Sequence, residues 1–368
     1  MVNALQNKPQ MSSIERIYNI AIKLKASDIH IHSDKQPSLR VDGRLYIMDE
    51  EPVFTEGELN QLVDDLLRPE QKEELVRKHQ VDTSIDFGEN GTLRVHIFRQ
   101  RGKLAMANRI IGHQIPSLGE LGLPPMVQKL SQLQRGLVLV SGATSNGKST
   151  TLAAIIEEIN HHFAKHILTI EDPIEFIFEN NRAMFSQRDI GIDATSFSQA
   201  IVAAMREDPD VILISDLRDN ETIENALIAA ETGHLVFATT HAPTAPDTIT
   251  RIIATFPSEK QDTIRVKMAQ NLRAVVAQRL VPAMDGIGRV LACEYMIMSA
   301  RIRELMLDPV KIGDIARLMQ GDQVTKGVLS FDVHLSQLVR DKKIDTETAL
   351  EFATSRTDMK LRLSGLLN

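Results

Sequence analysis

Hydrophobic and polar residues follow two different patterns along this chain, and one pattern gives way to the other near residue 115. Before it, apolar residues recur at helical spacing over residues 14–26, and shorter stretches such as SDIHIHS and GTLRVHIFRQ alternate apolar with polar residues. Spacing of three to four residues predicts an amphipathic helix, whereas strict alternation predicts a strand with one buried face. A polar helical stretch covers residues 55–79. The pattern therefore predicts a mixed α+β domain over residues 1–112, followed by a Gly/Pro-rich linker over residues 113–121.

Beyond the linker, apolar residues form short and nearly continuous runs that are separated by sequence of helical length. Four such runs are GLVLVSG, HILTIED, DVILISD and HLVFATTH. Apolar strands that alternate with helices are typical of a parallel sheet covered on both faces. We therefore expect an α/β domain over residues 122–298. From residue 299 to residue 368 the pattern predicts helices.

Composition narrows the possible functions. The 368 residues carry a net charge of −7 and no block of lysine and arginine, which argues against nucleic acid as a partner. Cys293 is the single cysteine, and this excludes an intrachain disulfide and a zinc site built from several cysteines. The first residues lack a signal pattern, and no apolar run approaches the ~18 residues of a membrane span. We expect a cytoplasmic protein.

The stretch SGATSNGKSTT follows the first apolar run and precedes a helical pattern, which is where a glycine-rich loop binds phosphate. GATSNGKS satisfies G-x-x-x-x-G-K-[ST], in which backbone N–H groups wrap the phosphates, the lysine reaches the β- and γ-phosphates and the hydroxyl binds Mg²⁺. Lys148 and Ser149 take these roles. The sequence therefore predicts a site for ATP and Mg²⁺ formed by Gly142, Ala143, Thr144, Ser145, Asn146, Gly147, Lys148, Ser149 and Thr150.

Acidic residues and histidines follow the other apolar runs. Glu171, Asp172 and Glu175 come after the second run, Asp216 after the third, and His234 and His241 stand at the two ends of the fourth. In an α/β sheet the carboxyl ends of the strands face the ligand crevice, so acids and the Thr240–His241 end of the fourth run can reach a bound phosphate. The alternative is that the acids are solvated turn or cap residues and that the histidines are structural.

Four ordered motifs carry a resemblance to a known family. GATSNGKSTT, ILTIEDPIEF, AMREDPDVILISDLRD and ETGHLVFATTHA resemble the Walker A motif, Asp box, Walker B motif and His box of the secretion ATPase superfamily, and most of all its PilT/PilU-like type IV pilus retraction ATPases. The absence of a four-cysteine module, which the assembly ATPases of the superfamily often carry, favours the retraction branch. The resemblance implies a PAS-like N-terminal domain joined to a RecA-like P-loop ATPase domain, in a hexameric ring with ATP between neighbouring subunits.

The resemblance also implies individual roles. Lys148 and Ser149 match the residues for phosphate and Mg²⁺, Glu175 the residue that activates water, and Asp216 the Walker B acid. His234 and His241 match the His-box pair. The family's N-domain arginines, some of which approach the nucleotide, are matched by Arg94, Arg101 and Arg109. The alternative for each arginine is a solvated strand residue.

The function implied is a ring ATPase that couples ATP hydrolysis to type IV pilus retraction, either as the motor or as a PilU-like accessory to a paralogous retraction ATPase. It would work on pilin indirectly, through a platform protein of the inner membrane. The chain departs from the family at Ser145, where glycine is usual, and at Ser215–Asp216, where Gly-Glu is usual. These changes predict retained nucleotide binding and slow turnover.

Three other functions remain open. The chain is also similar in size to a type IVB secretion ATPase. The changes at Ser145 and Asp216 favour a catalytically weak ring subunit that works with an active paralogue, whereas the retained Lys148, Ser149 and Glu175 oppose it. A RecA-like nucleic-acid motor is opposed by the acidic net charge.

Overall fold

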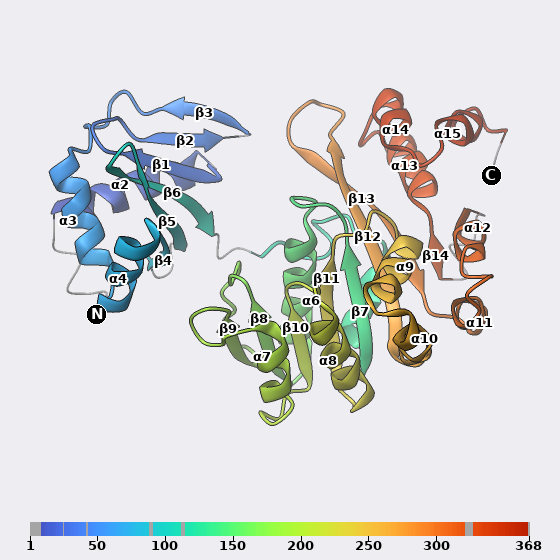
Figure 1. Cartoon of the computed structure of the whole chain (residues 1–368). Helices are drawn as coiled ribbons and strands as arrows, with labels where there is room; N and C mark the ends of the chain where they lie inside the picture. Colours follow the sequence, from blue (N-terminus) through green and yellow to red (C-terminus); the bar gives the residue numbers. More distant parts are fainter. Residues whose placement is uncertain are drawn as a thin grey trace. The chain divides into compact units, whose positions relative to one another are not determined.

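The chain folds into two compact units, Met1–Gln114 (unit 1) and Ile115–Asn368 (unit 2), each with its own sheet and hydrophobic core (Figure 1). The structure is a computed structural model that describes residues 9–24, 26–41, 43–87, 91–111, 115–320 and 327–366. The first two residues of the expected linker, and residues 321–326 and 367–368 of the expected helical tail, lie outside the described part. Leu118, within the expected linker, is buried in the core of unit 2.

Unit 1 is a six-stranded antiparallel sheet with helices on one face, which confirms the expected α+β class. The strand order is β3-β2-β1-β6-β5-β4. The strands are β1 (Asp28–His32), β2 (Ser38–Val41), β3 (Arg44–Ile47), β4 (Gln80–Asp86), β5 (Thr92–Gln100) and β6 (Lys103–Ile111). The helices are α2 (Pro9–Lys23), α3 (Glu56–Leu66) and α4 (Pro69–Lys78).

Alternation of apolar and polar residues explains why only one face of this sheet is covered. In β1, Ile29 and Ile31 are buried under the helices, whereas His30 and His32 lie on the opposite face. The polar stretch expected as one helix forms two, because the ring of Pro69 clashes with a helical conformation of the residue before it. Proline is well suited to the first turn of α4, which is where Pro69 lies.

Unit 2 is built on an eight-stranded sheet, and the four predicted apolar runs are its central parallel strands. The strand order is β14-β13-β12-β7-β11-β10-β8-β9, in which the six strands from β12 to β9 are parallel and β13 and β14 antiparallel. The strands are β7 (Gly136–Ser141), β8 (His166–Glu171), β9 (Met184–Asp189), β10 (Val211–Ile214), β11 (Leu235–Thr240), β12 (Leu272–Pro282), β13 (Arg289–Ile297) and β14 (Val328–Leu329).

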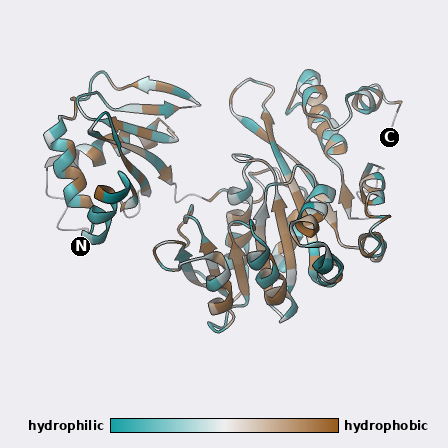
Figure 2. Cartoon of the chain, in the orientation of Figure 1, coloured by the Kyte–Doolittle hydropathy of each residue, from teal (hydrophilic) through white to brown (hydrophobic). Residues whose placement is uncertain are grey.

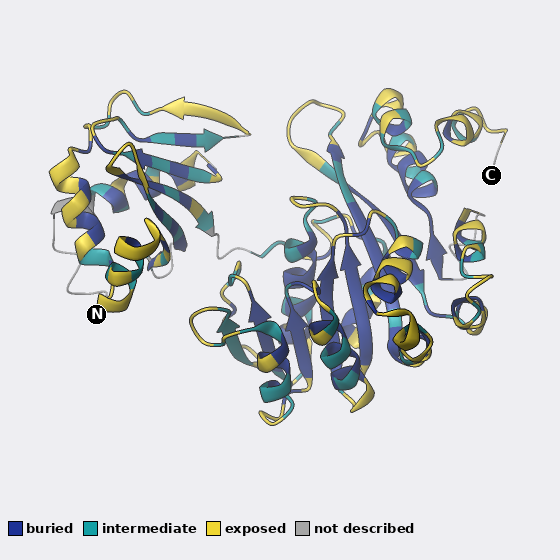
Figure 3. Cartoon of the chain, viewed as in Figure 1, coloured by how far each residue is buried: buried dark blue, intermediate teal, exposed yellow. Residues whose placement is uncertain are grey.

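Both faces of this sheet are covered by helices, as the continuous apolar runs predict. Along β7, Leu137 and Leu139 join one core cluster and Val138 and Val140 the other. Figure 2 shows these strands as largely hydrophobic, and Figure 3 shows them as buried. The helices of the domain are α5 (Pro125–Gln128), α6 (Lys148–His162), α7 (Phe197–Ala204), α8 (Asn220–Glu231), α9 (Ala245–Thr255) and α10 (Ser258–Asn271), with a 3₁₀ turn at Lys129–Gln132.

The C-terminal region is mainly helical but also contributes the short strand β14 to the sheet. Its helices are α11 (Ala300–Leu307), α12 (Asp314–Gln320), α13 (Phe331–Arg340), α14 (Thr346–Phe352) and α15 (Arg356–Leu363). Phe331 and Leu335 of α13 pack against Ala277 and Ala292 of the β12–β13 hairpin. The guanidinium of Arg279 lies 3.9 Å from the centre of the Phe331 ring. No described helix has the length and apolar character needed to cross a membrane.

Candidate functional site

The glycine-rich loop connects the end of β7 to the start of α6, and two glycines give it its path. Gly147 caps α6 with φ 78°, a left-handed conformation that glycine adopts without strain. Gly142 has φ 146°, and a Cβ there would lie 2.6 Å from the carbonyl oxygen of Gln278. The loop therefore passes too close to β12 for a side chain at this position.

Two loop residues that differ from the family's usual sequence are held by the β12–β13 hairpin. Ser145 adopts φ 65°, so it does take the left-handed conformation that costs a residue other than glycine about 1 kcal/mol. Its carbonyl oxygen accepts a hydrogen bond from Nη1 of Arg289 (3.2 Å). The neighbouring Asn146 accepts at Oδ1 from the backbone N–H of Leu280 (3.2 Å). These contacts hold the loop in place although the usual glycine is absent.

Lys148 is buried at the start of α6, and its ammonium lies over the loop. Nζ donates to the carbonyl oxygens of Gly142 (2.9 Å) and Ala143 (3.1 Å), which uses two of its three N–H donors. Burial lowers the pKa of this ammonium, and the carboxylates of Asp216 and Glu175 oppose that shift. Ser149 and Thr150 lie in the same first turn of α6 and are partly buried. The loop thus places a cation and two hydroxyl groups beside a helix N-terminus, where anions bind favourably.

The parallel register brings the ends of the neighbouring strands to this loop. Ser141, the last residue of β7, lies opposite Thr240, the last residue of β11. Strand β10 lies between β11 and β8, so Asp216 and Glu171 stand at the same edge of the sheet. Oγ1 of Thr240 is buried and has no hydrogen-bond partner in the described part of the chain.

Asp216 is buried, and its two carboxylate oxygens have different surroundings. Oδ2 accepts from Nε of Arg218 (2.5 Å) and from Nε2 of His241 (3.0 Å). Oδ1 is also buried, but no described residue donates to it. A buried carboxylate oxygen without a donor is a suitable ligand for a cation or for water bound to one. Arg218 was not predicted, although its position two residues after the Walker B acid is visible in the sequence.

The Asp box supplies two carboxylates with unequal exposure. Glu171 is buried, and burial raises the pKa of its carboxyl to about 7 against the hydrogen bond from Oγ1 of Thr169 (2.7 Å). Glu175 is exposed, and its backbone N–H donates to Oε2 of Glu171 (3.4 Å). Ser215 links the Asp box to the Walker B segment, because its hydroxyl accepts from the backbone N–H of Asp172 (3.2 Å). That bond gives a structural reason for serine where glycine is usual.

Gln278 on β12 is a second residue at the site that sequence reasoning missed. It is fully buried, and its Nε2 donates to Oγ1 of Thr151 on α6 (2.8 Å). Its partner lies 127 positions away along the chain, so no local sequence signal could have identified it.

Four predicted site residues do not lie at the P-loop within the chain: His234 is at the other end of β11, and the three arginines belong to unit 1. His234 precedes β11, at the end of the strand opposite His241, and its Nδ1 lies 2.9 Å from the carbonyl oxygen of Ala229. Within one chain it is therefore separated from the loop by about 20 Å, the length of six strand residues. In unit 1, Arg94 and Arg109 lie opposite each other on β5 and β6. Arg101 is exposed in the β5–β6 turn, and its role and those of the other three stay predictions.

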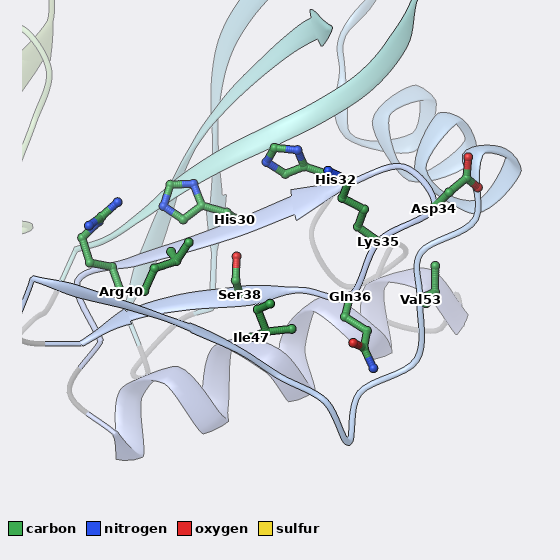
Figure 4. A pocket seen from close by; sticks show the side chains of 10 residues that line it. His30, His32, Asp34, Lys35, Gln36, Ser38, Arg40, Ile47 and Val53 are labelled. Atoms are coloured by element: carbon green, nitrogen blue, oxygen red, sulfur yellow. The ribbon is translucent and has the colours of Figure 1, made fainter. Parts of the chain in front are cut away.

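A hollow of about 590 Å³ lies on the open face of the unit 1 sheet, but no predicted site residue lines it. Figure 4 shows His30 and His32 of β1 beside Ser38 and Arg40 of β2, with Lys35 in the adjoining turn. The hollow belongs to unit 1, whereas the loop, Asp216 and Glu171 belong to unit 2.

Comparison with known proteins agrees with this geometry. The family model described as type II/IV secretion system protein matches residues 3–366. Two relatives from Pseudomonas aeruginosa are the type IV pilus ATPase PilU, 35% identical over 95% of this chain and 91% of that protein, and the type IV pilus retraction ATPase PilT, 36% identical over 92% and 98%. The crystal structure of the pilus retraction motor PilT with bound ADP has a TM-score of 0.86 at 39% identity, covering 94% of this chain and 98% of that one. The Legionella pneumophila ATPase DotB has a TM-score of 0.78 at 28% identity, covering 96% and 95%.

Proposed function

Because the chain belongs to the type II/IV secretion system protein family, we propose that it is an ATPase that couples ATP hydrolysis to type IV pilus retraction. The observation that carries this proposal is the P-loop of unit 2, in a chain whose likeness to the retraction ATPase PilT covers 98% of that relative. Retraction is favoured because the TM-score and the identity to the pilus retraction motor PilT exceed those to the ATPase DotB.

The loop and the first turn of α6 bind the phosphates of ATP. Backbone N–H groups of residues 142–147 surround them, and Lys148 uses its remaining N–H donor and its charge on the β- and γ-phosphates. The Ser149 hydroxyl and Oδ1 of Asp216 are the ligands that suit Mg²⁺, directly or through water. Mg²⁺ held there would neutralise charge that develops on the phosphates during transfer.

The two Asp-box carboxylates, Glu171 and Glu175, have different roles in positioning the attacking water. Glu175 is exposed at the site and orients the attacking water. Glu171 accepts the backbone N–H of Glu175 and so fixes the segment that carries it. Thr240 and His241 stand at the end of β11. The Thr240 hydroxyl, which has no partner among the described residues, suits the γ-phosphate, and His241 holds Asp216.

The working unit in this proposal is a homo-hexamer in the cytoplasm, held at the inner membrane by an integral platform protein and acting on pilin through it. Arg94, Arg101 and Arg109 are guanidiniums of unit 1 suited to a neighbouring subunit's nucleotide, because a guanidinium stays charged and binds phosphate as a fork. The identities to PilU and PilT are nearly equal, so turnover by the pure protein decides between accessory and motor.

The proposal is tested in the source strain by removing the gene and following fluorescently labelled pili. We expect retraction events to become rare or weak, to return with the wild-type gene, and not to return with Lys148→Ala. Ala substitution at His162, an exposed residue at the end of α6, is the matched control and should restore retraction. Normal retraction without the gene, together with loss of protein secretion, would instead support the type IVB function.

A further inference from the structure

Three arginines gather at the end of the unit 2 sheet that is opposite the P-loop. Arg135 directly precedes β7, Arg273 lies at a bulge where β12 begins, and Arg303 lies on α11. Gly136 makes room for this arrangement: a Cβ there would lie 2.6 Å from Cγ of Arg273. The end of the sheet opposite the P-loop, where β7 and β12 begin, therefore carries a cluster of positive charge.

These cations are not neutralised by carboxylates. In the described part of the chain, Arg135, Arg273 and Arg303 form no ion pair, whereas Arg301 on the same helix pairs with Glu304 at 2.8 Å. Nη1 of Arg273 donates only to backbone carbonyl oxygens, including that of Gln270 (2.8 Å). Nε of Arg303 is buried and has no acceptor among the described residues. Burial and the guanidiniums of Arg303 and Arg135 lower the pKa of Arg273.

Two of the three arginines, Arg273 and Arg303, line a groove with apolar edges. α10 and α11 lie side by side (Figure 1), and a hollow of about 450 Å³ between them is lined by Val266, Ala269, Gln270, Arg273, Arg303 and Leu307. Val266 is 43% exposed and Leu307 47% exposed, although both are large apolar residues. The groove thus offers partly buried guanidinium donors together with apolar surface.

We propose that this groove is the docking site for an acidic segment of a partner protein, with carboxylates on Arg273 and Arg303 and an apolar side chain between Val266 and Leu307. A guanidinium binds a carboxylate as a two-pronged fork, and a buried donor without an acceptor gains most from such a partner. The chain as a whole carries −7, so this positive groove stands out and steers an acidic segment to one place. The site is separate from the nucleotide loop and adds a partner surface to the proposed function.

A peptide fits this groove better than a membrane surface does. Nε of Arg303 is buried between two helices, so a side chain that enters the hollow reaches this donor more readily than a flat layer of lipid headgroups does. A peptide side chain can enter a hollow of this size, and the apolar edges give it a second contact that free phosphate would not use.

The test uses the full chain and a fluorescein-labelled octapeptide of alternating glutamate and leucine, with binding followed by fluorescence anisotropy. We expect the wild type to bind it about tenfold more tightly than the matched glutamine and leucine peptide, and more weakly as salt rises. Arg303→Gln and Arg273→Gln should each weaken binding about tenfold. Arg301→Gln, on the same helix but outside the groove, should change it by less than about twofold.

Leu307→Glu is a second variant that keeps the arginines and should repel the acidic peptide, since Leu307 is exposed and its replacement leaves the core intact. ATP turnover of each variant should match the wild type, which shows that it is folded. Equal binding of the two peptides, or undiminished binding by both arginine variants, would overturn the proposal. Arginine-dependent binding to phosphatidylglycerol vesicles or inorganic phosphate, without binding to the peptide, would overturn it as well and identify a lipid or phosphate site.

Discussion

Nε2 of His241 lies 3.0 Å from Oδ2 of Asp216, so the residue after β11 holds the Walker B acid at the end of the neighbouring strand β10. Arg218 donates to the same oxygen, which leaves Oδ1 of Asp216 as the oxygen available to a cation or water. We therefore expect the imidazole to affect the reaction by fixing the orientation of the Asp216 carboxylate.

Removing this imidazole should slow hydrolysis more than it weakens binding. In His241→Ala, one of the two donors to Oδ2 is lost, and misplacement of Oδ1 by about 1 Å can cost on the order of a hundredfold in kcat. The Lys148 and loop contacts to the phosphates stay intact, so the Kd for ATP should change by less than about threefold. Steady-state ATPase assays and calorimetry measure the two quantities, with His162→Ala as control. A Kd that rises as much as kcat falls would show that His241 binds ATP in its ground state.

Lengthening the Walker B acid should also lower turnover. Asp216 is buried and both donors to Oδ2 are already placed for the shorter side chain, so Asp216→Glu adds a methylene to a filled site at about 1–3 kcal/mol. We expect a clear fall in kcat for Asp216→Glu and near-total loss for Asp216→Ala. A rise with glutamate would mean that the aspartate side chain is too short for its task. Equal, near-zero rates for wild type and both variants would support the catalytically weak subunit.

Mixed rings test whether subunits share a nucleotide. A Lys148→Ala subunit lacks the phosphate cation, and an Arg101→Ala or Arg109→Ala subunit lacks a guanidinium of unit 1. If an arginine serves the neighbour's ATP, mixing the two inactive proteins should restore part of the ATPase activity, because some interfaces keep both groups. Light scattering or labelled subunits must show that the rings mix. Mixed rings that stay inactive at every ratio would argue against a shared site.

The buried carboxyl of Glu294 should make stability depend on pH. Burial raises its pKa to about 7, against the N–H groups of Ala245 and Phe331 and the charge of Arg279. The folded state then binds the proton more tightly than the unfolded state, so the free energy of unfolding is highest below the unfolded pKa of about 4.5 and falls as pH rises towards 7.

Glu294→Gln removes this ionisation. The difference between about 4.5 and 7 corresponds to an upper bound of roughly 3 kcal/mol. Urea unfolding followed by circular dichroism should show a shallower loss of stability between pH 5 and pH 7.5 in the variant than in the wild type. Glu171, whose pKa is also about 7, keeps part of the slope in both proteins. Identical slopes would show that Glu294 is paired more strongly than its burial indicates.

The central strands of unit 2 could be predicted because burial on both faces leaves an apolar residue at every position, as in β7 and β10. Strand β9 could not, since it lies at the sheet edge and its sequence MFSQRD carries polar residues that stay partly exposed. The short β14 was missed for a different reason: two buried residues are too few to show a period.

The meeting of the loop, Asp216 and Glu171 at one sheet edge follows from parallel topology, which the sequence pattern indicates. The particular hydrogen bonds do not follow from it. Asn146 meets Leu280 across 134 positions, and Arg289 reaches Ser145 across 144, so these contacts depend on how the β12–β13 hairpin folds over the loop. His234 shows the converse case, because its position before the fourth apolar run already indicates that it lies at the end of the strand opposite His241.

The hairpin bonds also connect the P-loop to the C-terminal helices of unit 2. The loop cannot change its path without straining the bonds from Leu280 and Arg289, and the same hairpin carries α13 through Phe331 and through the hydrogen bond from the backbone N–H of Cys293 to Nδ1 of His334 (2.9 Å). We therefore expect a displacement of the loop to be transmitted to the C-terminal helices through this hairpin. Ser145 and Asn146, the two substituted loop residues, are the loop residues that make these contacts with the hairpin.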